Sequence, residues 1–440
     1  MGNKNLVSET PYVCYNLSMV SKLISRLCSA GHEVYLVGGA VRDLLLDKKV
    51  ADEDLVTSAK PDEIIELFSD LEVNLVGKTF GVVIINGIEL ATFRSDVYDT
   101  PGKAEVTYAN SIEEDLSRRD LTINALAMCP LSGDIVDLHD GKIHLKNRII
   151  KFVGNPADRI KEDLVRIIRA ARFKAAINGV FDPETLYALR EFGHMVAENV
   201  APERIRLEVL KAMKIKKASR FFEALYEIGI LGSVFPCLEH TIDFDGGAYH
   251  GETVFEHNML AGDHISPKYR LLKLAAYLHD VGKPAAFKDD HFLEHEDIGA
   301  ELVRRELFAL RFSKAEIEHI TNLIKVHMNL VANLTPRASR RLLKRLADVE
   351  ISFYDFLRMK MADRAGNLAK ENRPFSHLVA LVRKFKKVNA PSKVTQLALN
   401  GHDIQELLGV GPGREVGQVL KTLLEVVLEN GEEFNNRKNW

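Results

Sequence analysis

The hydrophobic pattern of the chain changes near residue 158, and this change limits the possible architectures. Before it, β-rich runs such as "FGVVIING" (80–87) and "IELATFRSD" (88–96) alternate with short helical segments. The Asn86-Gly87 pair between these two runs predicts a tight hairpin. After residue 158, apolar residues recur at helical spacing, with breaks at residues 240–251 and 388–393. The sequence therefore predicts an α+β first part followed by an all-α remainder.

Size and composition indicate a folded protein with several domains. A chain of 440 residues is too long for one ordinary core, which predicts roughly two to four packed units. Apolar residues make up 46% and charged residues 28%, a balance typical of globular proteins. The net charge of −3 is not that of a strongly basic nucleic-acid binder. Any RNA contact must therefore come from local basic patches.

Targeting signals and cysteine motifs give no sign of a membrane or of an oxidising compartment. No apolar run approaches the roughly 18 residues that span a bilayer, and the start "MGNKNLVSETPY" lacks the apolar centre of a signal peptide. The four cysteines lie far apart and form no CxxC pair. We expect a cytoplasmic protein with no membrane partner.

Two aspartates in "VADEDLVT" (50–57) form a candidate magnesium site. Alternate side chains of a strand face the same way, so Asp52 and Asp54 would share one face while Glu53 points to the other. Magnesium prefers a few carboxylates together with phosphate oxygens, and two such ions can serve phosphoryl transfer. We choose Glu89, in the neighbouring predicted strand, as a third carboxylate. The alternative is that these acidic residues form a solvated turn.

The stretch "YLVGGAVRD" (35–43) lies just upstream and predicts a strand, a glycine turn and the start of a helix. Free backbone N–H groups at such a turn can receive phosphate. Arg42 adds a fork of donors suited to phosphate oxygens. Gly38 and Gly39 alone are weak evidence, because many strand-to-helix turns use glycine.

Four motifs together carry a resemblance to a known family. They are "GGAVRDLLL" (38–46), "DED" (52–54), "SRRDLTINALAM" (117–128) and "KEDLVRIIRAARF" (161–173). In this order they resemble the motifs of class II tRNA nucleotidyltransferases, the CCA-adding enzymes, and of bacterial poly(A) polymerases. The resemblance implies a polymerase-β-like nucleotidyltransferase head in which Asp52 and Asp54 bind catalytic Mg²⁺. It also implies CTP, ATP and tRNA as substrates.

The "EDLVR" stretch is a candidate for base selection. Asp163 and Arg166 are three residues apart, so on one helix they would share a face. A carboxylate accepts from an exocyclic amino group and a guanidinium donates to a ring nitrogen or carbonyl, and cytosine and adenine both offer such a pair. The resemblance implies that these two residues select CTP and ATP. The alternative is an ordinary ion pair on a helix surface.

Further residues for the nucleotide follow from the same motifs. The resemblance implies nucleotide contacts for Arg119, Asp120 and Asn124, whereas Arg118 and Arg119 taken alone could be a solvated helix entry. Arg169 and Arg172 continue the spacing of Arg166 as a basic stripe, which faces phosphates or flanks the apolar core.

A second set of motifs downstream resembles the HD domain, a helical phosphohydrolase fold. The HD resemblance implies a divalent metal held by His and Asp from separate helices, and such ligands suit a transition metal. Each histidine alone could instead be a hydrogen-bonded core residue. The candidate ligands are His257, His279, Asp280 and Asp363, with His295 and His327 as further candidates.

Together the two resemblances give four domains. They are a nucleotidyltransferase head (1–145), a helical neck and body (146–240), an HD domain (241–388) and a helical tail (389–440). Basic runs at 337–346 and 381–388 could contact RNA phosphates or be solvated helix faces.

Several functions remain open at this point. The region after "TFRSDVYD" reads "TPGKAEV", so Lys103 and Ala104 replace residues that related enzymes use during the change from CTP to ATP. CC-adding, A-adding and poly(A)-adding activities therefore stay as alternatives to full CCA addition. An HD phosphohydrolase as the main activity is a further alternative, and the oligomeric state is open.

Overall fold

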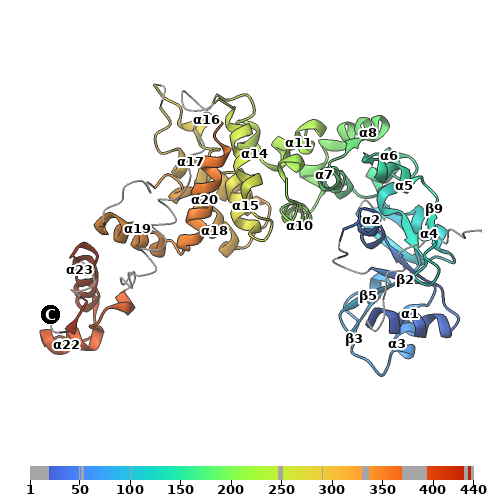
Figure 1. Cartoon of the computed structure of the whole chain (residues 1–440), viewed down its shortest axis with the longest axis horizontal. Helices are drawn as coiled ribbons and strands as arrows, with labels where there is room; N and C mark the ends of the chain where they lie inside the picture. The colour runs from blue at the N-terminus through green and yellow to red at the C-terminus, as the bar shows by residue number, and fades with distance from the viewer. Residues whose placement is uncertain are drawn as a thin grey trace, which may run out of the picture. The chain divides into compact units, whose positions relative to one another are not determined.

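The computed structural model describes residues 19–48, 50, 54–100, 102–245, 251–289, 291–329, 336–368, 394–430 and 435–437. The chain divides into two compact units. The first consists of Met1–Ala201 and Glu227–Ile230, and the second of Pro202–Tyr226 and Leu231–Trp440. Figure 1 labels many of their helices and strands.

The first unit is built on a seven-stranded sheet with the order β3-β4-β5-β2-β1-β8-β9. Neighbouring strands are antiparallel except β2 and β5, which are parallel, so the expected α+β head is confirmed. The strands are β1 (Val34–Val37), β2 (Leu55–Thr57), β3 (Val73–Asn74), β4 (Val82–Ile85), β5 (Ile88–Thr92), β8 (Leu126–Met128) and β9 (Ile135–Asp137).

The predicted hairpin at Asn86-Gly87 is confirmed. Ile85 pairs with Ile88 across the β4–β5 turn. Asn86 and Gly87 have φ values of 48° and 82°, as a two-residue turn with both central residues left-handed requires.

Each face of the sheet buries its own apolar cluster. Helices α1 (Met19–Ser29), α2 (Gly39–Leu45) and α3 (Pro61–Leu67) contribute to one face. Leu36, Leu55 and Leu90 from three strands lie in that cluster. Helix α4 (Ile112–Ser117) contributes to the other face, where Val37 and Val56 are buried. The alternation along β1 and β2 follows the two-residue period of a strand and fixes which side chains reach the site.

The rest of the first unit is a hairpin and a set of helices. Strands β6 (Arg94–Thr100) and β7 (Lys103–Tyr108) pair with each other outside the main sheet, and β10 (Ile149–Ile150) pairs with β11 (Val180–Phe181). The helices are α5 (Gly141–Lys146), α6 (Pro156–Glu162), α7 (Val165–Ile177), α8 (Pro183–Gly193) and α9 (Val196–Asn199).

The described residues of the second unit are almost entirely helical, as predicted. Its helices are α10 (Pro202–Ala212), α11 (Ser219–Ile228, whose end belongs to the first unit), α12 (Leu231–Val234), α13 (Pro236–Glu239), α14 (Val254–His264), α15 (Arg270–Tyr277), α16 (Lys283–Ala286), α17 (His295–Ala309), α18 (Lys314–Val326), α19 (Pro336–Asp348), α20 (Phe353–Gly366), α22 (Gly401–Leu408) and α23 (Arg414–Asn430). The predicted basic run at 337–346 lies on α19, and the run at 381–388 lies outside the described residues.

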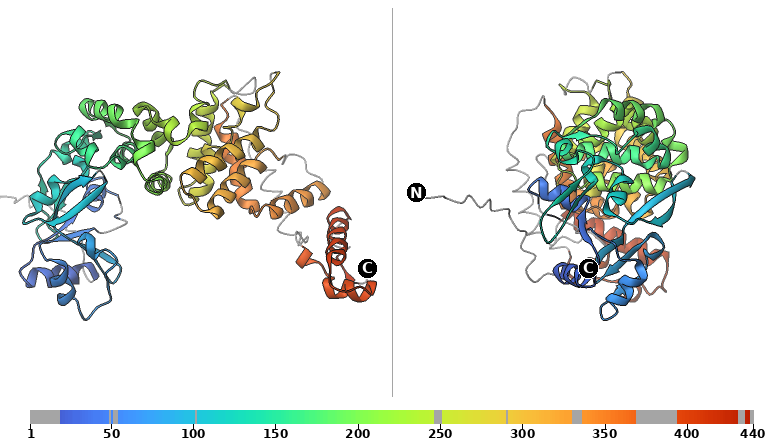
Figure 2. Two further views of the ribbon diagram at one scale, coloured as in Figure 1. Left: turned by 180° about the vertical axis from the view of Figure 1, so that it is seen from behind. Right: turned by 90° about the vertical axis from the view of Figure 1, so that its right-hand side faces the viewer.

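Helices α14, α15, α17, α18 and α20 form one bundle, in yellow to orange in all views (Figure 1, Figure 2). Gly366 lets α20 approach α14 closely, because a Cβ there would lie 2.9 Å from the His257 carbonyl oxygen. Among the described helices, none has the length and apolarity needed to cross a membrane.

Candidate functional site

The glycine turn after β1 is a strained backbone feature that only glycine tolerates. Gly38 has φ 58° and ψ −116°, and α2 begins at the next residue. A Cβ on Gly38 would lie 3.0 Å from the Arg119 guanidinium. Arg119 is thus packed over the turn, which brings together two motifs that are about 80 positions apart in the sequence.

Replacing Gly38 by alanine should impair folding and the nucleotide use that the motif resemblance implies. The strained backbone should cost about 1–3 kcal/mol, and the added methyl group should displace Arg119. Thermal unfolding and CTP incorporation measure the two effects. Gly31→Ala is the matched control, since Gly31 has φ 87° but a Cβ there would meet no atom within 4 Å. Equal loss of CTP incorporation in both variants would refute the Arg119 contact.

The acidic motif lies at the start of β2. Asp54 directly precedes β2, and its Oδ2 lies 4.0 Å from the position of a Cβ on Gly39. Arg42 Nη2 lies 3.6 Å from the same position. A carboxylate and a guanidinium therefore converge on the glycine turn. Asp52 lies outside the described residues.

Glu89 lies at the corresponding place in the adjacent strand. Leu55 pairs with Leu90 in the parallel β2–β5 ladder, so Asp54 and Glu89 each immediately precede a paired residue. Paired positions of neighbouring strands face the same side of a sheet. Glu89 is exposed, and its role as a third carboxylate stays a prediction.

Four further residues link Arg42 to α7. Arg42 Nη1 donates to Asn124 Oδ1 at 2.8 Å, and Asn124 Nδ2 donates to Asp120 Oδ1 at 3.3 Å. The other oxygen of Asp120 forms an ion pair with Arg169 at 2.6 Å. The Phe173 ring completes the circuit, with the guanidinium carbon of Arg169 at 5.6 Å from its centroid and that of Arg42 at 5.2 Å. We call these five residues the Arg42–Phe173 circuit.

Asp120 is the buried anion of this circuit. Its residue is only 7% exposed. Burial alone would raise the pKa of the Asp120 carboxyl, but the charge and hydrogen bond of Arg169, with those of the Leu121 N–H and Asn124, hold that pKa well below its usual range. Asp120 therefore stays ionised and orients Arg169.

The sequence left open that Arg118 and Arg119 are solvent-exposed residues at the start of a helix, and the structure contradicts this alternative. Both guanidiniums pair with the fully buried carboxylate of Asp115, at 2.6 Å and 2.9 Å. Burial alone would raise the pKa of Asp115, but Arg119 and Arg118 lower it. One buried carboxylate thus fixes both arginines.

The expected helix carrying both Asp163 and Arg166 is wrong. Helix α6 ends at Glu162, and Asp163 is extended, with φ −159° and ψ 104°. Its Oδ1 accepts from the Val165 N–H at 3.2 Å, because a short carboxylate competes for backbone donors and caps a helix start. Arg166 is buried in α7, where it pairs with Glu162 and donates to the Arg159 carbonyl at 2.7 Å. Asp163 thus lies at a break between two helices.

Arg172 lies closest to the Phe173 ring, with its guanidinium carbon 4.0 Å from the centroid. The guanidinium groups of Arg169 and Arg172 therefore both lie near the Phe173 ring in the first unit. This arrangement is compatible with phosphate binding, which stays a prediction for these two residues.

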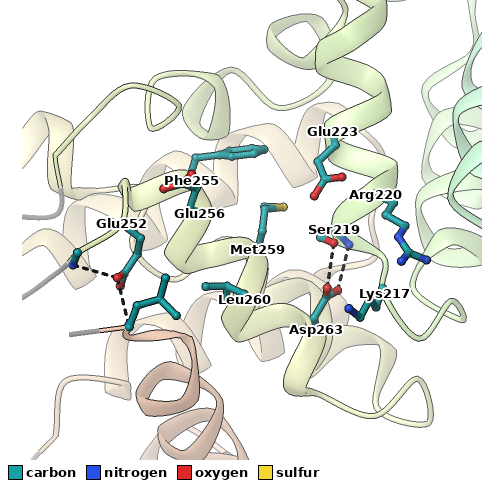
Figure 3. A pocket seen from close by; sticks show the side chains of 12 residues that line it. Lys217, Ser219, Arg220, Glu223, Glu252, Phe255, Glu256, Met259, Leu260 and Asp263 are labelled. Atoms are coloured by element: carbon teal, nitrogen blue, oxygen red, sulfur yellow. Dashed lines mark hydrogen bonds between the residues drawn. The ribbon is translucent and has the colours of Figure 1, made fainter. Parts of the chain in front are cut away.

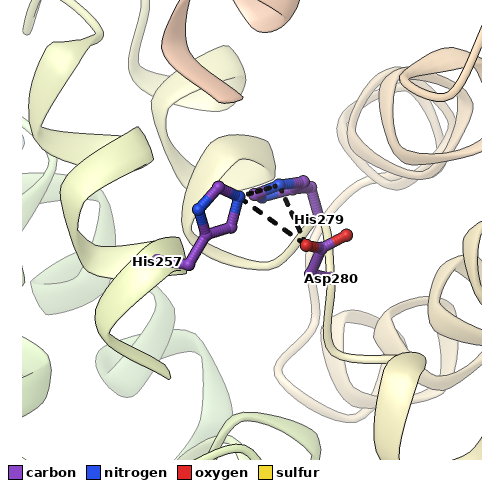
Figure 4. A group of neighbouring side chains, drawn as sticks. All are labelled: His257, His279 and Asp280. Carbon is purple, nitrogen blue, oxygen red and sulfur yellow. Dashed lines mark hydrogen bonds and ion pairs between the residues drawn. The ribbon is translucent and has the colours of Figure 1, made fainter. Parts of the chain in front are cut away.

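In the second unit, the candidate HD ligands converge from separate helices. His257 on α14, and His279 and Asp280 just after α15, bring their ligand atoms together (Figure 4). The Nε2 atoms of His257 and His279 are 3.2 Å apart, and both lie within 3.7 Å of Asp280 Oδ2. Asp363 Oδ1, on α20, lies 3.4 Å from His257 Nε2.

The other oxygen of Asp280 faces a second group. Nε2 of His295, at the start of α17, and Nε2 of His327, just after α18, each lie 3.3 Å from Asp280 Oδ1. His295 can approach because Gly282 has no side chain: a Cβ there would lie 2.0 Å from the His295 carbonyl oxygen. The donor set therefore contains two three-residue groups that share Asp280.

Backbone carbonyls orient three of these imidazoles. Nδ1 of His279, His295 and His327 lies 2.9, 2.8 and 2.6 Å from the carbonyl oxygen three residues earlier. Since a carbonyl only accepts, Nδ1 carries the proton and Nε2 offers a lone pair to the centre of the cluster. This tautomer is the one that a metal ligand needs.

The charges of the cluster also fit a cation. Burial lowers the pKa of His279 to about 3, which keeps this imidazole neutral. For His257, burial is outweighed by the carboxylates of Asp363 and Asp280, and the pKa is raised. The site therefore favours an added positive charge beside His257, which a divalent ion can supply.

Two residues at this cluster escaped the sequence reasoning. Lys283 Nζ lies 2.6 Å from Asp280 Oδ2, and Glu252 Oε1 lies 3.3 Å from His257 Nδ1. The three-residue spacing of Asp280 and Lys283 within "HDVGK" could have indicated the first contact. Glu252 is in the segment before α14 and had no comparable signal.

A cavity of about 530 Å³ lies along α14, beside the start of α11 (Figure 3). Two of its carboxylates have structural partners. Asp263 accepts from the N–H and hydroxyl of Ser219, and Glu252 accepts from the Leu368 N–H. The two Asp263 bonds tie α14 to the start of α11, and the Glu252 bond ties the segment before α14 to the residues after α20.

Comparisons with known proteins agree with this geometry. Residues 34–151 match the poly(A) polymerase head domain, residues 180–242 match a probable RNA and SrmB-binding site of polymerase A, and residues 248–352 match the HD domain. Parts of the chain are therefore similar to the poly(A) polymerase head domain and to the HD domain. Curated proteins that resemble it over about half of its length are CCA-adding enzymes.

Three of these relatives show the extent of the similarity. A CCA-adding enzyme of Levilactobacillus brevis is 37% identical over 233 residues, which are 52% of this chain and 58% of that protein. One of Bacillus cereus is 41% identical over 200 residues, 44% of this chain and 49% of that protein. The matched part thus spans about half the length of these curated relatives. The Bacillus stearothermophilus CCA-adding enzyme in complex with CTP is 25% identical, with a TM-score of 0.66 over 94% of both chains.

Proposed function

We propose that this protein adds C, C and A to the 3′ end of tRNA, using CTP and ATP and releasing pyrophosphate. The observation that carries the proposal is the convergence of Asp54 and Arg42 on the Gly38-Gly39 turn. A carboxylate for a metal and a guanidinium for phosphate at one backbone turn suit a nucleoside triphosphate. The similarity to CCA-adding enzymes supports this substrate class.

Different residues of the head would bind the metal and the triphosphate. Asp54, with Asp52 and Glu89, would hold Mg²⁺, which when bound supplies charge stabilisation for attack of the RNA 3′ hydroxyl on the α-phosphate. Arg42 and Arg119 lie at the turn and would bind triphosphate oxygens. Gly38 and Gly39 let the chain pass close to those phosphates.

Asp163 and Arg166, at the break between α6 and α7, would select the base. Asp163 is held there by the Val165 N–H, and Arg166 is held by Glu162 and the Arg159 carbonyl. Fixed partners reduce the rotamer freedom that base binding would otherwise remove. The two side chains would accept from the exocyclic amino group and donate to the ring acceptor of cytosine or adenine.

Replacing Asp163 by asparagine should lower kcat/KM for CTP and ATP roughly 10- to 100-fold, because the acceptor for the base amino group is weakened. The Asn side-chain oxygen can still cap Val165, so the fold should be retained. Single-turnover addition of each nucleotide to tRNA measures the effect. Asp158→Asn, on the exposed surface of α6, is the control. If UTP and GTP lose as much kcat/KM as CTP and ATP, Asp163 does not read the base.

The direct test of the function uses three tRNA transcripts, which end at the discriminator base, at the first C and at the second C. The proposal requires C addition to the first two and A addition to the third. A-only addition to every transcript, or a long A tail, would place the protein in a partial or poly(A)-adding branch.

A second activity is favoured by the HD cluster. We propose that its four histidines and two aspartates bind a divalent transition metal and hydrolyse a phosphoester. The orientation of three Nε2 atoms by backbone carbonyls is the observation that supports it. A metal bound there would supply a water activated for attack on phosphorus. Lys283, at 2.6 Å from Asp280, is placed to neutralise substrate or ligand charge.

A further inference from the structure

The Phe173 ring is surrounded by three guanidinium groups. Those of Arg172, Arg42 and Arg169 have their central carbons at 4.0, 5.2 and 5.6 Å from the ring centroid. Phe173 is 6% exposed and lies near the end of α7, whereas Arg42 belongs to α2. A single aromatic side chain thus joins the base-selecting helix to the helix that follows the glycine turn.

An aromatic ring orients a guanidinium without occupying its hydrogen-bond donors. Arginine has five N–H groups, and those of Arg42 make three bonds to side chains: one to Asn124 and two to Asp43. Among the described residues, no side chain accepts a hydrogen bond from the other two N–H groups of Arg42, so they can face a ligand. A carboxylate in the position of Phe173 would compete for these two donors, but the ring face attracts the cation and leaves them available.

Side-chain contacts restrain Arg42 on the other side as well. Asn124 is held by Asp120, and Asp120 by Arg169, which returns to the same ring. Movement of the ring would therefore disturb Arg42 directly, and also through the polar branch of the Arg42–Phe173 circuit. The same circuit includes no contact that distinguishes one base from another.

We propose that Phe173 is a positioning residue that sets the Arg42 guanidinium for the triphosphate. The inference rests on the proposed nucleotidyltransferase function and extends it. Because Arg42 would meet phosphates, which all nucleotides share, the effect of Phe173 is the same for CTP and ATP. Phe173 acts through Arg42 and does not itself touch the substrate.

A double-mutant cycle tests the inference. Phe173→Leu should raise the Kd and KM for both CTP and ATP by one common factor, roughly 3- to 30-fold, as expected for a lost cation–π contact in a partly buried site. In an Arg42→Gln background, Phe173→Leu should raise these Kd and KM values less than about twofold, because the Arg42 guanidinium that Phe173 positions is already absent. Factors that multiply independently in the double variant would overturn the proposal.

Phe181→Leu provides the matched control. Phe181 is 7% exposed and has a cation, Lys174, near its ring, but it is not part of the circuit. Both leucine variants should lose similar thermal stability, while only Phe173→Leu should weaken CTP binding. A Phe181→Leu variant that weakens CTP binding equally would reduce Phe173 to a core residue. A changed CTP-to-ATP ratio in Phe173→Leu would show action on base selection instead.

Two readouts separate this inference from the proposed function. Isothermal titration with CTP and Mg²⁺ in the absence of RNA measures Kd for the four proteins of the double-mutant cycle without turnover. Nucleotide addition to tRNA measures KM for the same four proteins with turnover. Wild-type protein that binds CTP but extends no tRNA overturns the proposed function, while the binding cycle still decides the role of Phe173. Wild-type protein that binds no CTP overturns both.

Discussion

Replacing Asp54 by asparagine should reduce nucleotide addition by roughly a thousandfold or more, which corresponds to about 4 kcal/mol of transition-state stabilisation. Asp54 lies where β2 begins, beside the glycine turn that precedes Arg42 on α2. Under the proposed function, loss of its charge removes a magnesium ligand, and the substitution removes no apolar packing. The measurement is the rate of CTP addition to tRNA, together with thermal unfolding to show that the fold is retained.

Asp70→Asn is the control for this variant. Asp70 is a surface residue whose side chain is 59% exposed and pairs with Arg26. It should leave addition unchanged. Glu89→Gln tests the third carboxylate in the same assay, and a loss close to that of Asp54→Asn would support it. An Asp54→Asn protein that kept a tenth of wild-type activity would contradict the assignment of Asp54 as a metal ligand.

Replacing Asp280 by asparagine should abolish metal binding in the HD cluster and any phosphoester hydrolysis, because Asp280 is the only residue shared by the two candidate ligand groups found among the described residues. His295→Ala should remove one group and leave His257, His279 and Asp280 in place. Metal content after dialysis against Mn²⁺, Co²⁺ or Ni²⁺, and hydrolysis of p-nitrophenyl phosphate and its bis ester, measure the two effects.

The head provides the internal reference for this experiment. Asp280→Asn should change CTP addition less than about twofold, since Asp280 belongs to the second unit and the residues proposed to bind the nucleotide belong to the first. His264→Ala, an exposed histidine on α14, is the control for metal content. Equal metal content in Asp280→Asn and wild type would rule out the cluster as the metal site.

Local patterns predicted the parts of the head that depend on local geometry. Asn86-Gly87 predicted a two-residue turn, because few other pairs accept left-handed φ at both positions. Gly38 likewise marked the strand-to-helix turn, where it has φ 58°, whereas Gly39 is the first residue of α2. The one parallel pair, β2 with β5, was not predictable from the apolar pattern, which does not encode strand direction.

The motif proposed for base selection shows where periodicity misleads. A three-residue spacing predicted one helix face for Asp163 and Arg166, but the Asp163 carboxylate binds the Val165 N–H and separates α6 from α7. Helical spacing shows which apolar residues share a helix face. It does not show where a polar side chain binds a backbone N–H group and interrupts the helix.

Long-range contacts account for most of what the sequence did not reveal. Asp120 and Arg169 form their ion pair across 49 positions, and the motifs named both without pairing them. No motif assigned a role to Phe173, and its three arginine neighbours become visible in the fold. The candidate HD ligands, by contrast, were predictable as a set from their motifs, and the spacing of Asp280 and Lys283 offered a signal for their contact, although the tautomers were not predictable.

The most direct test of the central claim is single-nucleotide electrophoresis of a tRNA that ends at the discriminator base, after incubation with the purified protein and Mg²⁺. With CTP alone the account predicts two added residues, and with CTP and ATP together it predicts three and then no further growth. Failure to extend the tRNA under any nucleotide condition would contradict the claim that this head is a tRNA nucleotidyltransferase.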